Sequence, residues 1–197
     1  MRKRRLILTI ALAAVTAAVR ADIINGPDDG QSQRKTEHTV AVGGSVSWIT
    51  SKVYNSYHSY DRWIAGPGVD IEYNFVSKNG FGAGAAFFYN STHIAGTSVQ
   101  TWYAGPLVAY RLRMGSWQMG ADLGLGYSNC DLEGHDEKGM AMKSDVNVEY
   151  RISSHFGIMA QMGGITTFFG GTNDYGKDEE LNGISYWGLS LGICVHL

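Results

Sequence analysis

The sequence predicts an all-β protein, an eight-stranded antiparallel up-and-down transmembrane β-barrel. Three observations support this fold class: eight segments alternate apolar with polar or very small residues, aromatic residues stand near the ends of the apolar faces, and short connections alternate with long ones. Successive side chains of a strand point to opposite faces, so each segment has one apolar and one polar face. A strand that crosses a bilayer needs an apolar face bracketed by aromatic residues.

The eight segments follow one another from residue 40 to the end of the printed sequence, and every second residue of each, beginning with the first, is expected to face outward. Segment 117–127 shows this well, because Trp117, Leu123 and Tyr127 share one face and Gln118 and Asp122 the other. The expected strands are 40–48, 69–75, 81–89, 102–112, 117–127, 142–152, 156–168 and 187–197.

The connections between these segments are expected to be tight at 77–80, 113–116 and 153–155, and long at 50–66, 90–98, 129–139 and 170–184. Short turns on one rim and long loops on the other are typical of bacterial outer-membrane barrels, with the turns in the periplasm. Pro106 lacks an N–H in the middle of a segment, which predicts a β-bulge there.

Outward aromatic residues form two predicted membrane-interface belts. If the first strand runs upward, the periplasmic belt is Phe75, Phe81, Tyr110, Trp117, Tyr150 and Phe156, and the outer belt is Trp48, Tyr89, Trp102, Tyr127, Phe168 and Trp187. A soluble barrel that carries a lipid is the alternative, with its apolar face inside. The polar face favours the membrane barrel, because it combines charged residues with many glycines and therefore suits a narrow interior.

The first 21 residues read as a secretory signal peptide, with a basic start, an apolar run at 6–18 and a small residue, Ala21, before the cleavage point. The apolar run is shorter than the roughly 20 residues that a spanning helix needs. Residues 22–36 predict a polar periplasmic lead-in, and residues 37–197 the barrel.

Cleavage would remove five of the 16 Lys and Arg residues and none of the 18 Asp and Glu residues, so the net charge would change from −2 to −7. An acidic mature chain argues against nucleic-acid binding. Cys130 and Cys194 are expected near opposite ends of the barrel, beyond the reach of a disulfide, which predicts two free thiols.

In this architecture the chain resembles the small eight-stranded outer-membrane proteins of Gram-negative bacteria, such as OmpX and the membrane domain of OmpA. The resemblance covers residues 37–197 and implies a monomer in the outer membrane, in contact with its lipid and lipopolysaccharide and inserted by the barrel-assembly machinery. Such barrels commonly end in an aromatic residue that is read during assembly. Leu197 keeps the outward position without the ring.

The inward charged residues are expected to fill the interior as a network of ion pairs, because an eight-stranded barrel is only wide enough for its own side chains and buried charges need partners. These residues are Asp70, Glu72, Arg111, Asp122, Lys143, Asp145, Glu149 and Arg151. A narrow porin-like conduit lined by the same residues is the alternative.

The sequence predicts a structural or surface-recognition role, with no catalytic residue, cofactor or metal site. A lipid A-modifying enzyme is a further alternative, which needs Ser, His and an acidic group together on the lipid face near the outer rim. His58-Ser59 and Ser91-Thr92-His93 lie near that rim but in predicted loops, and no triad assembles.

The predicted loops carry two notable compositions. Loop one, residues 54–63, is rich in Tyr and Ser, which suits either adaptable contact with an extracellular ligand or an interfacial position among lipid headgroups. Two other loops are acidic, with Asp131, Glu133, Asp136, Glu137, Asp174, Asp178, Glu179 and Glu180.

Overall fold

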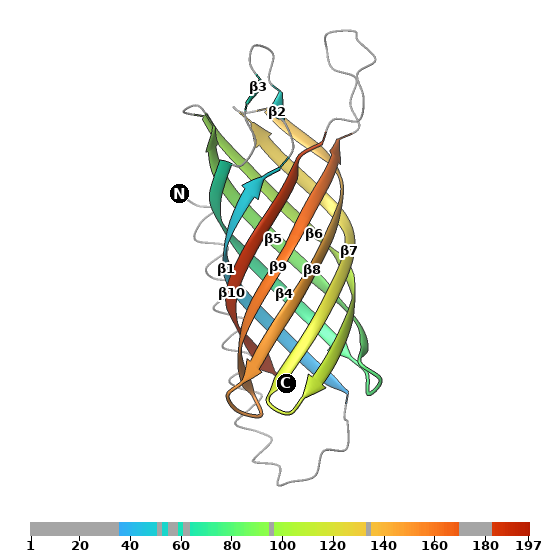
Figure 1. Ribbon diagram of the computed structural model, residues 1–197. Helices are drawn as coiled ribbons and strands as arrows, with labels where there is room; N and C mark the ends of the chain where they lie inside the picture. The colour runs from blue at the N-terminus through green and yellow to red at the C-terminus, as the bar shows by residue number, and fades with distance from the viewer. Residues whose placement is uncertain are drawn as a thin grey trace.

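The computed structural model of the chain describes residues 36–50, 53–54, 59–60, 64–94, 97–132, 135–169 and 183–197. Within them, eight strands close into one tilted barrel (Figure 1). They are β1 (Glu37–Ile49), β4 (Ile64–Val76), β5 (Phe81–Ile94), β6 (Thr97–Met114), β7 (Trp117–Leu132), β8 (His135–Arg151), β9 (Phe156–Phe169) and β10 (Ser185–His196). The short strands β2 (Val53–Tyr54) and β3 (Ser59–Tyr60) form a separate sheet.

Each barrel strand pairs antiparallel with the barrel strands before and after it, and β1 also pairs with β10. The closing ladder runs from Thr39 opposite His196 to Ile49 opposite Tyr186, so the barrel has no free edge. The predicted fold class is confirmed. No helix in the described part of the chain is long and apolar enough to cross a membrane.

The two faces of the barrel wall carry the chemistry that the alternation predicts. Most outward side chains are exposed, with Phe81 at 66% and Leu191 at 69%, whereas the inward Glu72 and Lys143 are 1% and 4% exposed. Val195 is at an outward position of β10 but is buried. A soluble lipid-carrying barrel has its apolar face inside, so that alternative is wrong.

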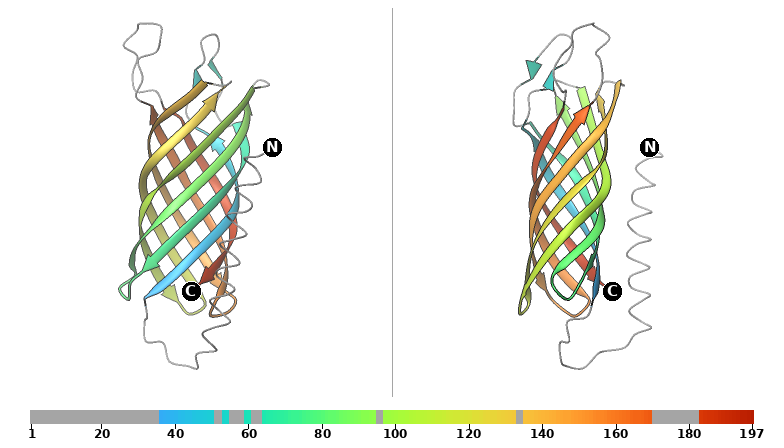
Figure 2. Two further views of the ribbon diagram at one scale, coloured as in Figure 1. Left: turned by 180° about the vertical axis from the view of Figure 1, so that it is seen from behind. Right: turned by 90° about the vertical axis from the view of Figure 1, so that its right-hand side faces the viewer.

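Three short connections lie at one end of the barrel, which we call the turn end (Figure 2): residues 77–80, 115–116 and 152–155. Gly80 and Gly115 have φ angles of 87° and 62°, where side-chain-bearing residues are strained. The expected turn at 113–116 is two residues long instead, because Arg113 and Met114 remain paired with β7.

The opposite end, called the loop end, carries β2 and β3 (Figure 1). The long loops predicted at 90–98 and 129–139 are wrong, since β5 and β6 stay paired to Ile94 opposite Thr97, and β7 and β8 to Leu132 opposite His135. Here the outward face of these strands becomes polar while their backbone pairing continues, so the alternation that marks a membrane strand fades before the strand ends.

Some predicted features lie outside the described residues and stay predictions. These are the signal peptide, the lead-in up to residue 35, most of loop one, and the fourth loop with its acidic residues; Glu133 is also outside. Within the expected first loop, β4 already begins at Ile64. The acidic Asp131, Asp136 and Glu137 belong to β7 and β8.

Pro106 is accommodated without the predicted bulge. On the β7 side, Ala104 pairs with Tyr127 and Leu107 with Gly124, so the register is the same before and after the proline. The ladder omits only residues 105 and 106, and the pairing with β5 is continuous. A proline has no backbone N–H to donate to a neighbouring strand. The interruption of the ladder on one side accommodates this missing donor without an extra residue.

The interior contains apolar layers as well as charged ones. At the loop end, inward apolar side chains form a buried cluster of Ile49, Val99, Cys130, Phe169, Ile184 and Tyr186. This cluster was missed because much of it falls in or beside segments expected to be loops. Cys130 and Cys194 are both buried and both free thiols, as predicted.

Candidate functional site

The eight charged residues predicted to line the interior all occupy inward-facing positions of their strands. All except the half-buried Arg151 are buried. They divide into two groups along the barrel axis. The central cluster consists of Asp70, Glu72, Arg111, Asp122, Lys143 and Asp145. Glu149 and Arg151 belong to a second cluster at the turn end.

In the central cluster, Lys143 joins strands from opposite sides of the barrel. Its Nζ lies 2.6 Å from Glu72 Oε1 and also contacts Asp145 Oδ2. Glu72 is on β4 and Lys143 on β8, four strands apart in either direction around the closed order. Gln161 of β9 donates from Nε2 to Glu72 Oε1 at 2.8 Å. These bonds therefore cross the interior.

The second pair of the central cluster is Arg111 with Asp122. The guanidinium donates to both carboxylate oxygens, at 2.6 and 2.9 Å, and Asn147 donates to Asp122 Oδ2 at 2.7 Å. Gly120 is opposite Arg111 in the ladder, and a Cβ there would lie 2.6 Å from Arg111 Nη1. The guanidinium thus needs the space that this glycine leaves.

Negative charge is in excess in the central cluster. Its six described residues comprise four carboxylates and two cations. Oxygens of Glu72, Asp122 and Asp145 lie within 4.8 Å of one another. Glu72 Oε2 and Asp145 Oδ1 are buried without a hydrogen-bond partner in the described part of the chain.

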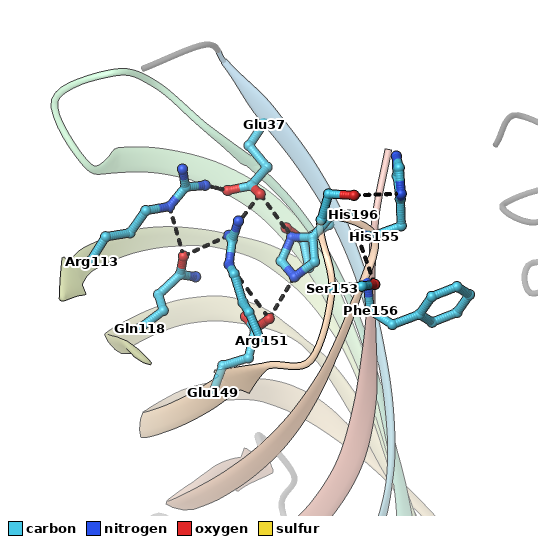
Figure 3. Close-up of polar contacts among 11 residues, drawn as sticks. Glu37, Arg113, Gln118, Glu149, Arg151, Ser153, His155, Phe156 and His196 are labelled. Atoms are coloured by element: carbon cyan, nitrogen blue, oxygen red, sulfur yellow. Dashed lines mark hydrogen bonds and ion pairs between the residues drawn. The ribbon is translucent and has the colours of Figure 1, made fainter. Parts of the chain in front are cut away.

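The turn-end cluster is centred on Glu37, the first residue of β1 (Figure 3). Its carboxylate pairs with Arg113 and, at 2.7 Å, with Arg151. The ring nitrogens of His196 lie 2.8 Å from Glu37 Oε1 and 2.5 Å from Glu149 Oε1. This cluster therefore ties β1, β6, β8 and β10 together across the opening.

Three members of that cluster, Glu37, Arg113 and His196, were absent from the predicted network, as was Gln118. Gln118 accepts hydrogen bonds from both Arg113 and Arg151, at 3.2 and 2.9 Å. Gln118 and His196 could have been included in the predicted network, because the alternation places both of them on the inward face. Glu37 gave none, because it precedes the first apolar position of its strand.

The predicted belt residues all lie on the outward face, and many meet in pairs across neighbouring strands. At the turn end, the ring centroids of Phe81 and Tyr110 are 4.8 Å apart and those of Trp117 and Tyr150 4.9 Å. At the loop end, Trp48 meets Trp187 and Trp102 meets Tyr127, each at 5.5 Å. The remaining belt residues are Phe75, Tyr89, Phe156 and Phe168. His38, which was not predicted, stacks edge-on against Phe75 at 5.0 Å.

The residues considered for an enzyme are placed differently from the prediction. Ser91 and His93 lie in β5, where they alternate outward near the loop end. Ser91 of β5 is opposite Gln100 of β6, and Gln100 is opposite Asp131 of β7. The Asp131 backbone is therefore two strands from that of Ser91, a distance of about 10 Å. His58 lies outside the described residues.

Comparison with known proteins supports the fold and no closer relationship. No family model matches the chain, and no curated protein matches it. Among solved structures, neisserial surface protein A aligns with a TM-score of 0.55 and 18% identity over 80% of this chain and 96% of that one. Ail of Yersinia pestis, in complex with the heparin analogue sucrose octasulfate, aligns with 0.53 and 11% over 83% and 99%. The outer membrane protein AlkL aligns with 0.50 and 15% over 88% and 95%. The chain thus has the fold of the small outer-membrane β-barrels.

Proposed function

We propose that the protein is a monomeric integral outer-membrane barrel, closed by its own side chains, that serves a structural or surface-recognition role through its loop end. The observation that carries this proposal is the Lys143–Glu72 bond, which joins opposite strands through the middle of the interior. The apolar cluster at the loop end and the Glu37 cluster at the turn end add two further layers of packed side chains.

The outer wall supports insertion in a bilayer. It is apolar over most of its height, and paired aromatic residues lie at both ends. Such a wall is stable in lipid and costly in water. Under this proposal the signal peptide is cleaved after Ala21, the barrel-assembly machinery inserts the chain, and lipid and lipopolysaccharide surround it. The turn end faces the periplasm.

The loop end is the surface that we assign to recognition. Among its described residues, Asp131, Asp136 and Glu137 outnumber the one exposed lysine, Lys138, and make it acidic, with Asp136 and Glu137 exposed. Like charges repel, so this part of the surface favours a cationic or neutral partner over a polyanion. Ail was solved with a polyanionic heparin analogue, and we propose a different ligand class here.

Two measurements test the closed barrel. The folded protein should migrate differently on a gel before and after boiling and should fractionate with the outer membrane. After reconstitution in planar bilayers it should give no steady unitary conductance. Reproducible single-channel steps from the wild-type protein would instead support the narrow conduit lined by the central cluster.

A lipid-modifying enzyme is the second candidate, and the outward position of Ser91 and His93 on β5 favours it. Against it, no hydrogen bond between these two side chains, or from either to a carboxylate, is present among the described residues. The mass of lipid A from cells with and without the protein decides between the roles. We expect the same mass. A loss of an acyl chain that Ser91→Ala abolishes, and that Ser98→Ala on the adjacent strand leaves intact, would establish the enzyme.

A further inference from the structure

A pocket opens at the turn end of the barrel, beside the connection between β4 and β5. Its volume is about 170 Å³. One water molecule needs roughly 10–15 Å³ measured in this way, so the pocket has room for several waters or for a phosphate group. It is lined by the turn at 77–80, by residues 110–113 of β6, and by Glu37, Val76 and Gln118.

The unequal lengths of neighbouring strands create this pocket. β5 begins at Phe81, which is opposite Tyr110, whereas β6 continues past that point. Arg111 N still donates to Gly80 O at 2.8 Å, and residues 112–114 are paired with β7 alone. The end of β6 therefore projects beyond the turn and leaves a notch on its β5 side.

The pocket reaches from the opening of the barrel to its lipid-facing wall. Tyr110 and Leu112, which line it, are at outward positions of β6, and Leu112 is 51% exposed. Tyr110 belongs to the aromatic belt of the turn end, and such belts lie at the level of the lipid headgroups. Glu37 and Arg113 line the same pocket from inward positions. One ligand can therefore contact charged groups and the apolar wall together.

Positive charge is in excess in this pocket. The charged residues of its lining are Glu37, Lys78, Arg111 and Arg113. Arg111 is paired with Asp122, and Glu37 contacts Arg151 as well as Arg113. Lys78 is exposed in the turn and has no acidic partner in the described part of the chain. The three short connections contain no Asp or Glu, so the pocket favours an anion.

The Arg113 guanidinium is held at the wall of the pocket by other side chains (Figure 3). Its Nε donates to Gln118 Oε1 at 3.2 Å, and its Nη2 contacts the Glu37 carboxylate. The Arg113 side chain is nevertheless 42% exposed, so an anion can approach it. The planar fork of a guanidinium matches the oxygens of a phosphate group.

We infer that this pocket binds the phosphate group of a phospholipid from the surrounding membrane. Lys78 and Arg113 are the cationic contacts, and the acyl chains lie along the outer wall beside Leu112. The lipid-facing part of the lining distinguishes this ligand from a free phosphate ion. The inference rests on the proposed function, which puts the barrel in the outer membrane with its turn end in the periplasm.

The test uses the folded wild-type protein in a maltoside detergent, which contains no phosphate. Phosphatidylglycerol is titrated, and native mass spectrometry counts the bound lipid. Diacylglycerol with the same acyl chains lacks the phosphate, and inorganic phosphate lacks the chains. We expect diacylglycerol to bind at least about tenfold more weakly. Inorganic phosphate at an equal concentration should leave the phospholipid bound.

A matched pair of variants locates the site. Lys78→Glu reverses one charge in the exposed turn and should weaken phosphatidylglycerol binding by about tenfold or more. Lys138→Glu makes the same change at an exposed position near the loop end of β8 and should leave binding unchanged. The boiled and unboiled gel mobilities show that each variant is folded. Because Lys78 is exposed and makes no ion pair among the described residues, its replacement should not impair folding.

Three results with folded protein would overturn the inference and leave the proposed function in place. The first is equal binding of diacylglycerol and phosphatidylglycerol. The second is displacement of the phospholipid by an equal concentration of inorganic phosphate, which would assign the pocket to a free anion. The third is equal affinity of Lys78→Glu and Lys138→Glu. A wild-type protein without a gel shift and outside the outer-membrane fraction would contradict the proposed function, and this inference with it.

Discussion

The His196 imidazole contacts the carboxylate of Glu37, with Nδ1 2.8 Å from Oε1. Glu37 is the first residue of β1, and His196 is the last residue of β10. The ladder between these strands closes the barrel, and the side-chain contact joins their ends inside it. The backbone continues this junction, because Leu197 N donates to His38 O at 2.9 Å.

Replacing His196 should weaken this closure. His196→Ala leaves the half-buried carboxylate of Glu37 and the buried carboxylate of Glu149 each without one partner, so we expect a loss of about 1–3 kcal/mol in the free energy of unfolding. Urea titration of the reconstituted protein, monitored by tryptophan fluorescence, measures this loss of stability. His93→Ala removes an exposed imidazole at the other end of the barrel and serves as the control. Equal stability of the two variants would contradict the structural role of His196.

The Lys143–Glu72 bond predicts a strong and non-additive effect. Lys143→Met leaves buried carboxylates uncompensated and should cost about 3–5 kcal/mol. Adding Glu72→Gln removes one of those charges, so the double variant should recover part of the loss. A double-mutant cycle measures the coupling between the residues. Strictly additive effects would show that the bond does not form in the folded protein.

Gly120 should resist substitution more than an outward glycine does. A Cβ at Gly120 would lie 2.5 Å from Asn147 Oδ1 and 2.6 Å from Arg111 Nη1, whereas nothing lies within 4 Å of a Cβ at Gly44. Gly120→Ala should therefore destabilise by about 1–3 kcal/mol, and Gly44→Ala should change stability by less than about 0.5 kcal/mol. Their urea midpoints provide the comparison. The reverse order would mean that Arg111 is elsewhere.

Two buried tyrosines should respond in opposite ways to removal of the hydroxyl. The Tyr103 hydroxyl is buried and unpartnered in the described part of the chain, so Tyr103→Phe should be neutral or stabilising by about 1 kcal/mol. The Tyr186 hydroxyl is 2.6 Å from Thr101 Oγ1, so Tyr186→Phe should cost about 1 kcal/mol. Thermal unfolding of the two variants compares them directly. A loss of stability in Tyr103→Phe would reveal a hydrogen-bonded hydroxyl at that position.

The strands could be predicted because a lipid environment imposes a simple rule on them. Every outward position within the apolar band must be apolar, so the alternation at 117–127 or 142–152 is nearly complete. Where β5 and β6 extend beyond that band, as at Ser91 and His93, the outward face is polar and the rule no longer applies. The predicted strands therefore ended too early. The bulge predicted at Pro106 was wrong for a different reason, because the strand accommodates the proline by an interruption of the ladder.

The interior could be predicted as a set of inward charges, but its partners could not. Alternation places Glu72 and Lys143 on the inner wall, yet 71 residues separate them in the chain, and the relative tilt and register of all eight strands decide that they meet. Glu37 shows the same limit, because its role depends on Arg113 and Arg151 reaching it from β6 and β8.

Local alternation was thus enough to determine the eight strands, their two faces and the closed barrel, because each strand responds separately to lipid on one side and a narrow interior on the other. The ion pairs that cross the interior and the apolar cluster at the loop end were decided only when the strands closed. Contacts such as Lys143–Glu72 and Arg151–Glu37 join strands that are not neighbours in the sequence, and no local pattern in the chain specifies which of those strands face one another across the barrel.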